Sequence, residues 1–206
     1  MSPSHTDTAS PAFSNTSTVA DLIRRSAGRF STDTAIEFGD RTWTYAELDA
    51  AVTAVARELL RLGAGKGDRI AAYGKNSDAY VLLYLGCARA GIIHVPVNFQ
   101  LKHDELEYIL DNAGARIVFA DDDLIEAVTS TATGTEAEVI DLASLAPVAT
   151  ADSIAPAGDG EFSVDDTDIA QLLYTSGTTS APKGAVMTHR ALVHEYLSSL
   201  LALDFA

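Results

Sequence analysis

Strand-like and helix-like hydrophobic patterns alternate along most of this chain, and this alternation restricts the fold more than any other feature of the sequence. Short apolar runs are followed repeatedly by stretches in which apolar residues recur at three- and four-residue steps. Strand–helix repeats of this kind build a mainly parallel sheet with helices on both faces, so the sequence predicts an α/β fold. The expected strands are 34–40, 69–75, 92–98, 116–120, 137–142, 169–174 and 185–189, and the expected helices are 44–62, 77–90, 104–113 and 121–133.

One helix shows both its start and its buried side in the sequence. Thr44 and Glu47 have the Thr-x-x-Glu spacing of a capping box, in which each side chain accepts a hydrogen bond from a backbone N–H at the helix start. Apolar residues then recur on one side until Gly63, which favours burial of that side against the sheet. The residues of this side are Leu48, Val52, Val55, Leu59 and Leu62.

The cysteine content and the first residues of the chain favour a cytoplasmic protein. Cys87 is the one cysteine, which excludes an intramolecular disulfide and a cysteine-based zinc cluster. It falls in the strongly apolar helix 77–90, where a core role is expected because apolar surroundings penalise a thiolate. Residues 1–18 contain no Lys or Arg and no apolar run, unlike a secretory or transit leader. No apolar run approaches the roughly 20 residues that span a bilayer, so no transmembrane segment is expected.

The charge balance excludes nucleic acid as a partner. The chain has 14 Lys and Arg against 29 Asp and Glu, which gives a formal net charge of −15. Affinity for nucleic acids depends largely on Lys and Arg that displace counterions from the phosphate backbone. A chain this acidic would repel that backbone, and a small-molecule ligand is the more reasonable expectation.

Composition divides the chain into four parts. Residues 1–18 are expected to form a disordered tail, and residues 19–145 an α/β subdomain. Residues 146–168 combine proline and glycine with six acidic residues and no basic residue, which is typical of a solvated acidic linker. Residues 169–206 contain two further strands and a helix, and we expect this domain to be truncated at its C-terminus.

A loop rich in hydroxyl groups separates the strands expected at 169–174 and 185–189. Its hydroxyls can donate hydrogen bonds, its glycine lets backbone N–H groups approach a ligand closely, and its lysine adds a positive charge. These groups are suited to binding phosphate, although composition alone favours a plain turn. The candidate ligand-binding residues are Thr175, Ser176, Gly177, Thr178, Thr179, Ser180 and Lys183.

The order of residues 174–184, Tyr-Thr-Ser-Gly-Thr-Thr-Ser-Ala-Pro-Lys-Gly, resembles the phosphate-loop signature of the adenylate-forming enzymes. This superfamily contains acyl-CoA synthetases, luciferases and peptide-synthetase adenylation domains. Ser180 departs from the pattern, which usually has glycine there; a positive φ at this position would strain serine by about 1 kcal/mol. Residues 42–76 and 82–121 also resemble the N-terminal region of these enzymes. The resemblance implies an incomplete N-terminal domain of the adenylate-forming fold.

The resemblance also implies a two-step reaction. A carboxylate attacks the α-phosphate of ATP, bound with magnesium, to give acyl-AMP and pyrophosphate, and the thiol of CoA then displaces AMP. The loop residues named above would contact the β- and γ-phosphates, and Lys183 would be catalytic by neutralising the departing pyrophosphate. The runs HVPVNF and HDELEYIL are closer to fatty-acyl and aryl-CoA synthetases than to adenylation domains.

Two alternatives remain open at this stage. The chain could be a non-catalytic nucleotide-binding or scaffold module, or part of another adenylate-forming enzyme such as a peptide-synthetase adenylation domain. The family's later motifs, which supply the adenine pocket, the magnesium-binding Glu and a C-terminal Lys, are not found in these residues. We therefore expect the 206-residue chain alone to be inactive.

Two histidines follow the loop, but their spacing does not favour catalysis or metal binding. His189 and His194 are five residues apart on a helix capped by Thr188, so they do not share a face as ligands at i and i+4 would. We expect structural roles for both. The sequence also has no Gly-x-Ser-x-Gly, His-Glu-x-x-His or Walker-type run, which argues against a serine hydrolase, a zinc protease and a Walker-type NTPase.

Overall fold

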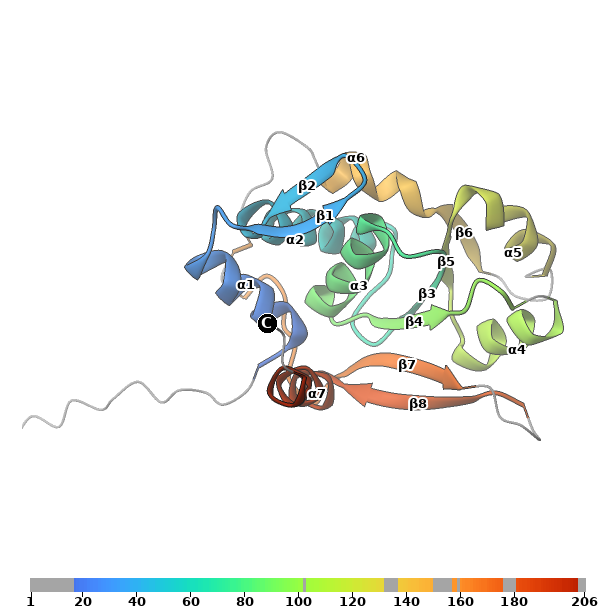
Figure 1. Ribbon diagram of the computed structural model, residues 1–206. Coiled ribbons are helices and arrows are strands. Elements are labelled where there is room, and N and C mark those ends of the chain that lie inside the picture. The colour runs from blue at the N-terminus through green and yellow to red at the C-terminus, as the bar shows by residue number, and fades with distance from the viewer. Residues whose placement is uncertain are drawn as a thin grey trace, which may run out of the picture.

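Within the residues that the structure describes, six strands form one sheet with helices on both faces (Figure 1). The computed structural model describes residues 17–101, 103–131, 137–149, 157–158, 160–175 and 181–203. Strands β6, β5, β3, β4 and β7 lie side by side in that order and are parallel, and β8 pairs antiparallel with β7 at the edge. The predicted mainly parallel α/β sheet is confirmed. The strands are β3 (Arg69–Tyr73), β4 (Ile93–Val97), β5 (Ile117–Ala120), β6 (Glu138–Asp141), β7 (Ile169–Thr175) and β8 (Lys183–Thr188).

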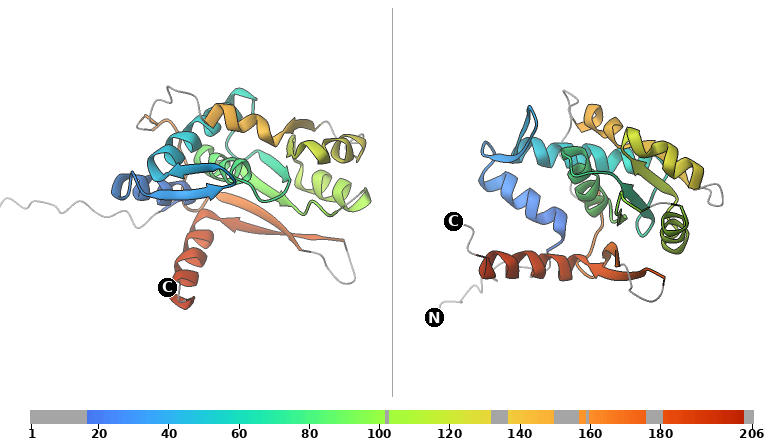
Figure 2. Two further views of the ribbon diagram at one scale, coloured as in Figure 1. Left: turned by 45° about the horizontal axis from the view of Figure 1, so that its top comes forward. Right: turned by 45° about the vertical axis from the view of Figure 1, so that its right-hand side comes forward.

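Each face of the sheet is covered by its own helices (Figures 1 and 2). Helices α2, α3 and α6 pack on one face together with parts of α1 and α7, and α4 and α5 pack on the other. None of the described helices combines the length and apolar character needed to cross a bilayer. The helices are α1 (Val19–Arg29), α2 (Tyr45–Arg61), α3 (Asp78–Ala90), α4 (Asp104–Ala113), α5 (Ile125–Thr131), α6 (Leu145–Ala149) and α7 (His189–Ala202).

Helix α2 begins and ends where the sequence predicts. The Thr44 hydroxyl accepts the N–H of Glu47, and the Glu47 carboxylate accepts the N–H of Thr44 at 2.8 Å, so the capping box is present. The predicted apolar side faces the core: Leu48, Val52, Val55 and Leu59 are at most 3% exposed, and Leu62 is half-buried.

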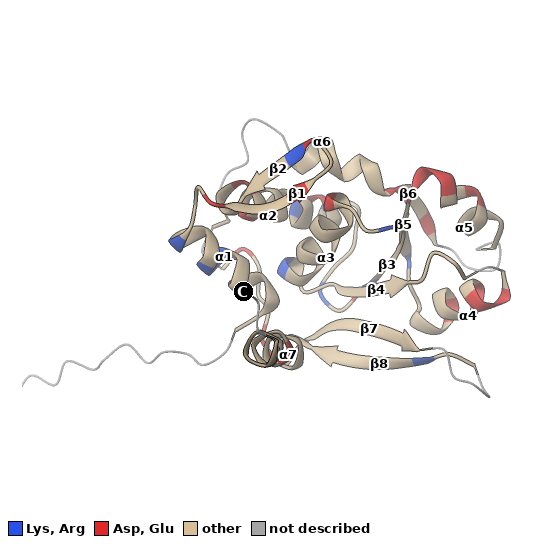
Figure 3. Cartoon of the chain, viewed as in Figure 1, with Lys and Arg blue, Asp and Glu red and all other residues tan. Residues whose placement is uncertain are grey.

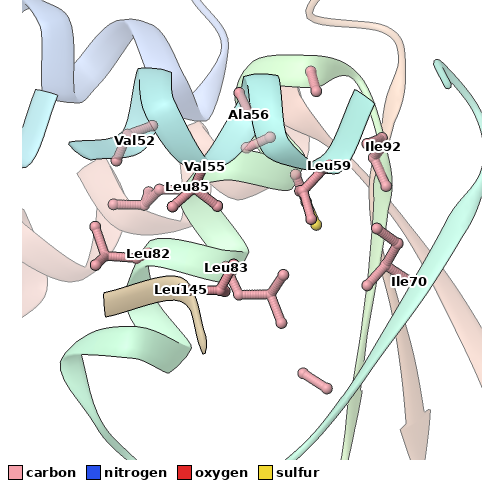
Figure 4. Packing of buried hydrophobic residues seen from close by; sticks show 14 of the residues in the cluster. Val52, Val55, Ala56, Leu59, Ile70, Leu82, Leu83, Leu85, Ile92 and Leu145 are labelled. Carbon is pink, nitrogen blue, oxygen red and sulfur yellow. The ribbon is translucent and has the colours of Figure 1, made fainter. Parts of the chain in front are cut away.

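Helices α2 and α3 pack closely because one of them lacks a side chain at the contact (Figure 4). A Cβ atom at Gly86 of α3 would lie 2.6 Å from Cγ1 of Val55, so a larger residue there would push α2 away. Cys87 is the next residue, and it is fully buried. Burial raises the pKa of its thiol, which agrees with the predicted core role.

A buried arginine joins the same two helices. The side chain of Arg89 in α3 is 1% exposed and forms an ion pair with the carboxylate of Asp49 in α2. Its Nη1 atom also donates to the Asp49 carbonyl at 2.7 Å and to the Thr53 hydroxyl at 2.5 Å. The positive charge is therefore accommodated by three acceptors that come from one turn of α2.

Several elements differ from the prediction. Helix α1 and strand β2 (Arg41–Thr44) were not expected; β2 pairs antiparallel with β1 (Thr34–Phe38) in a separate two-stranded sheet. The helix expected at 121–133 consists, over its described residues, of the 3-10 turn η1 (Asp122–Leu124) and α5. Helix α6, preceded by the 3-10 turn η3 (Leu142–Ser144), occupies the start of the expected linker.

Three acidic residues of the expected linker form ion pairs with other parts of the molecule. Glu161 pairs with Arg57 at 2.6 Å and Asp168 pairs with Lys66 at 2.7 Å. The nearly buried Asp166 accepts two hydrogen bonds from Arg190, the shorter at 2.8 Å. These contacts fix the described part of this segment against α2 and α7. The expected tail, apart from residues 17 and 18, lies outside the described residues; Thr18 caps α1.

Candidate functional site

The predicted loop connects β7 to β8, and the two strands bring its ends together. Their antiparallel pairing extends from Ile169 opposite Thr188 to Thr175 opposite Lys183. Side chains of directly opposite residues lie on the same face of a sheet, so the side chains of Thr175 and Lys183 leave the hairpin on the same face. Both residues are exposed. The other predicted residues, Ser176, Gly177, Thr178, Thr179 and Ser180, lie outside the described residues.

Within the described residues, no ion pair neutralises the positive charge of Lys183, so this charge is available to a ligand. Lys66, Lys75 and Arg190 each form an ion pair with an aspartate, whereas Lys183 forms none with another described residue. Lys183 is the first residue of β8, and Figure 3 shows a basic position at this loop end of the strand. A hydroxyl donor and an exposed ammonium at a loop end are suited to bind an anionic ligand.

A cleft opens beside this loop, between β4 and β7. Among the described residues, these strands share one ladder pair, His94 with Gln171. Beyond that pair lies a cleft with a volume of about 730 Å³, lined among others by Lys75, Asn98 and Tyr174. It lies at the carboxyl ends of β3, β4 and β7, where the chain leaves β3 for α3 on one face and β4 for α4 on the other. Open α/β sheets bind ligands at such points.

His94 holds β7 against β4 and was not anticipated from the sequence. Its ring is 1% exposed, and its Nδ1 atom accepts a hydrogen bond from the Gln171 amide at 3.1 Å. The rings of Tyr80 and Tyr84 lie 5.7 Å and 5.2 Å from it, measured between centroids. Burial lowers the pKa of His94 to about 3, so the imidazole is neutral at pH 7.

We expect this buried imidazole to make the protein sensitive to acid. Unfolded His94 binds a proton below about pH 6.5, whereas folded His94 does so near pH 3. The unfolded state therefore binds more protons in this window, and His94 should lower the free energy of unfolding by about 1.4 kcal/mol for each pH unit below 6.5. Urea unfolding between pH 4 and pH 8 measures this slope. His94→Asn should flatten it, while the slope contributed by the buried His189 remains; an unchanged slope would contradict the assignment.

The two histidines of α7 do not converge on the loop. His189 is fully buried, and its Nδ1 atom accepts the N–H of Val19 at 3.3 Å, which joins α7 to the start of α1. His194 lies five residues further along the helix and is exposed. Within the described residues, no group of three or more His, Cys, Asp or Glu side chains is arranged to hold a metal ion.

Comparison with known proteins identifies the class to which this fold and loop belong. The family model for AMP-binding enzymes matches residues 23–204. The chain therefore belongs to the AMP-binding enzyme family, and its fold is that of the N-terminal domains of adenylate-forming enzymes.

Individual relatives in this family differ in the substrates for which they are named. A feruloyl-CoA synthase from an Amycolatopsis species is 34% identical over 181 residues, which are 84% of this chain and 34% of the relative. The long-chain-fatty-acid–CoA ligase FadD13 of Mycobacterium tuberculosis is 36% identical over 168 residues, which are 78% of this chain and 32% of the relative. The chain thus spans about a third of the length of these curated relatives.

A solved structure shows the same arrangement of elements. The crystal structure of VinN superposes with a TM-score of 0.83 at 29% sequence identity. The match covers 92% of this chain and 50% of that chain. The similarity therefore extends over most of this chain.

Proposed function

We propose that the protein containing this chain activates a carboxylic acid with ATP, forming acyl-AMP and pyrophosphate, and then transfers the acyl group to CoA. One observation carries the proposal: in a member of the AMP-binding family, the strands β7 and β8 bring Thr175 and Lys183 together at the ends of the signature loop. The ammonium and hydroxyl groups fit the anionic phosphates of ATP chemically.

In this proposal the chain positions the phosphates of ATP and neutralises their negative charge. The carboxylate is already ionised at neutral pH, so the first step needs no side-chain base. Thr175, Ser176, Gly177, Thr178, Thr179 and Ser180 donate hydrogen bonds to the β- and γ-phosphates. Lys183 stabilises the negative charge that develops as pyrophosphate leaves. Magnesium, which usually binds through substrate phosphates and keeps several waters, would supply further charge neutralisation.

The proposed substrate is a fatty acid or an aryl acid. FadD13 is named for long-chain fatty acids, and the Amycolatopsis relative is named for a feruloyl substrate. The local sequences 94–99 and 103–110, which resemble fatty-acyl and aryl-CoA synthetases, favour these two kinds of acid over an amino acid, and a fatty acid is our first choice. We further propose that the protein works in the cytoplasm.

The proposed domain organisation serves the same reaction. Residues 19–145 form the supporting subdomain, and residues 169–206 present the phosphate loop. Residues 146–168 connect them, and their ion pairs with Arg57, Lys66 and Arg190 limit how far the two parts can separate.

Carboxylate-dependent exchange of labelled pyrophosphate into ATP tests the proposal. The full-length protein should catalyse exchange with a fatty or aryl acid and should form the corresponding CoA thioester when CoA is added. Amino acids belong in the same panel, because exchange with an amino acid alone would favour an adenylation domain instead. Nucleotide binding without exchange for any acid would favour a non-catalytic module. The 206-residue chain alone should catalyse no exchange.

A further inference from the structure

The end of β7 has little backbone support on one side. Among the described residues, its pairing with β4 is confined to His94 and Gln171, whereas β3 and β4 remain paired as far as Tyr73 and Val97. On its other side β7 pairs with β8, which is the edge strand of the described sheet. The last residues before the phosphate loop therefore belong to a two-stranded ribbon, and such ribbons are marginally stable without further contacts.

A side-chain contact takes the place of the missing backbone pairing. The hydroxyl of Tyr174, the residue before Thr175, donates a hydrogen bond of 2.7 Å to the Oδ1 atom of Asn112 in α4. The Tyr174 ring packs against the apolar cluster beneath α4 and α5. Burial raises the pKa of Tyr174, so the hydroxyl stays protonated and can donate at neutral pH.

The same tyrosine also sets the geometry of β8. Tyr174 lies directly opposite Gly184, and a Cβ atom at Gly184 would be 3.1 Å from the Cζ atom of its ring. The ring therefore occupies the space that a side chain at position 184 would need. Because Lys183 precedes Gly184, the position of the Tyr174 ring affects both ends of the loop, Thr175 on one strand and Lys183 on the other.

We infer that Asn112 and Tyr174 are positioning residues for the phosphate loop, and that their hydrogen bond fixes Thr175 and Lys183 in the orientation that binds phosphate. This inference rests on the proposed function of the loop. Neither residue needs to touch the ligand. Their hydroxyl–amide bond anchors the free end of the hairpin to α4, so that less freedom is lost when the loop binds its ligand.

The experiment measures binding of inorganic tripolyphosphate to the full-length protein by titration calorimetry. This probe contains the phosphates that the loop should hold but no adenine or ribose. Tyr174→Phe removes only the hydroxyl, and Asn112→Ala removes only its acceptor. Each should weaken binding by about three- to tenfold, the equivalent of losing one ordinary hydrogen bond. The double variant should bind no more weakly than either single variant, because the same bond is lost in all three.

The controls separate positioning from stability and from the proposed function itself. Tyr45→Phe removes a tyrosine hydroxyl at the start of α2, on the other face of the sheet, and should leave affinity unchanged. Melting temperatures should stay within a few degrees for all variants, since the bond is exposed. If the wild type binds tripolyphosphate and Tyr174→Phe binds equally well, or if the two losses multiply in the double variant, the inference is wrong. If the wild type does not bind tripolyphosphate, the phosphate role of the loop is wrong, and the inference is wrong with it.

Discussion

Replacing Lys183 with alanine should slow carboxylate-dependent ATP–pyrophosphate exchange by about 10²- to 10³-fold, the usual cost of removing one group that stabilises developing charge. Lys183 has no ion pair with another described residue, so its loss leaves no partner unpaired in that part of the structure. The effect should therefore fall on the reaction and not on folding. Exchange of labelled pyrophosphate in the full-length protein measures it.

Two further variants define what the lysine contributes. Lys183→Arg keeps the positive charge and should retain a larger share of the activity, although a guanidinium does not reproduce the compact ammonium. Arg61→Ala removes a charge from the exposed end of α2, where Arg61 pairs with Glu58, and should leave exchange unchanged. Unchanged exchange in Lys183→Ala would remove the catalytic role assigned to this residue.

Asp49→Ala should lower the free energy of unfolding by about 3 kcal/mol, because it leaves the charge of a buried arginine without its carboxylate. Arg89 is 2% exposed and cannot reach bulk water instead. Its Nε atom already has no hydrogen-bond partner among the described residues, so the site has no spare acceptor. Urea denaturation at pH 7 measures the loss.

The matched variant removes the arginine and keeps the aspartate. Arg89→Met fills a similar volume with an apolar chain, and the Asp49 side chain, which is 28% exposed, can then be hydrated. The free energy of unfolding of the Arg89→Met variant should remain within about 1 kcal/mol of the wild-type value. A loss in Arg89→Met as large as that in Asp49→Ala would show that the pair stabilises the fold in its own right, contrary to this account.

Local signals predicted most of the fold, and elements that depend on distant contacts were missed. The capping box of Thr44 and the apolar side of α2 lie within a few residues of each other, so the sequence displays them directly. Strand β2 is four residues long and mostly polar; its Trp43 is buried in the core, where the indole N–H donates to Asp78, 35 residues away. No local pattern can reveal such a contact.

The same distinction applies to the candidate site. The order of residues 174–184 identified the loop and its lysine before the strands around it were known. The side chains that support it were not found, because Tyr174 and Asn112 are 62 positions apart and Gln171 and His94 are 77 positions apart. The ion pairs of the acidic segment 146–168 were not predicted either, because its basic partners come from α2, α7 and the turn before β3.

The narrow junction between β4 and β7 has a mechanical consequence. The ribbon of β7 and β8 continues directly into α7. Among the described residues, this unit is joined to the rest of the molecule by one ladder pair with β4, by side-chain bonds such as that of Tyr84 in α3 with Tyr196 at 2.7 Å, and by the buried side chains of Ala170, Leu192 and Val193. The junction is a seam, and a tilt of the unit along it would repack these three core residues but break few backbone hydrogen bonds. Small changes in the bonds that cross the seam would then redirect the loop without remodelling the sheet.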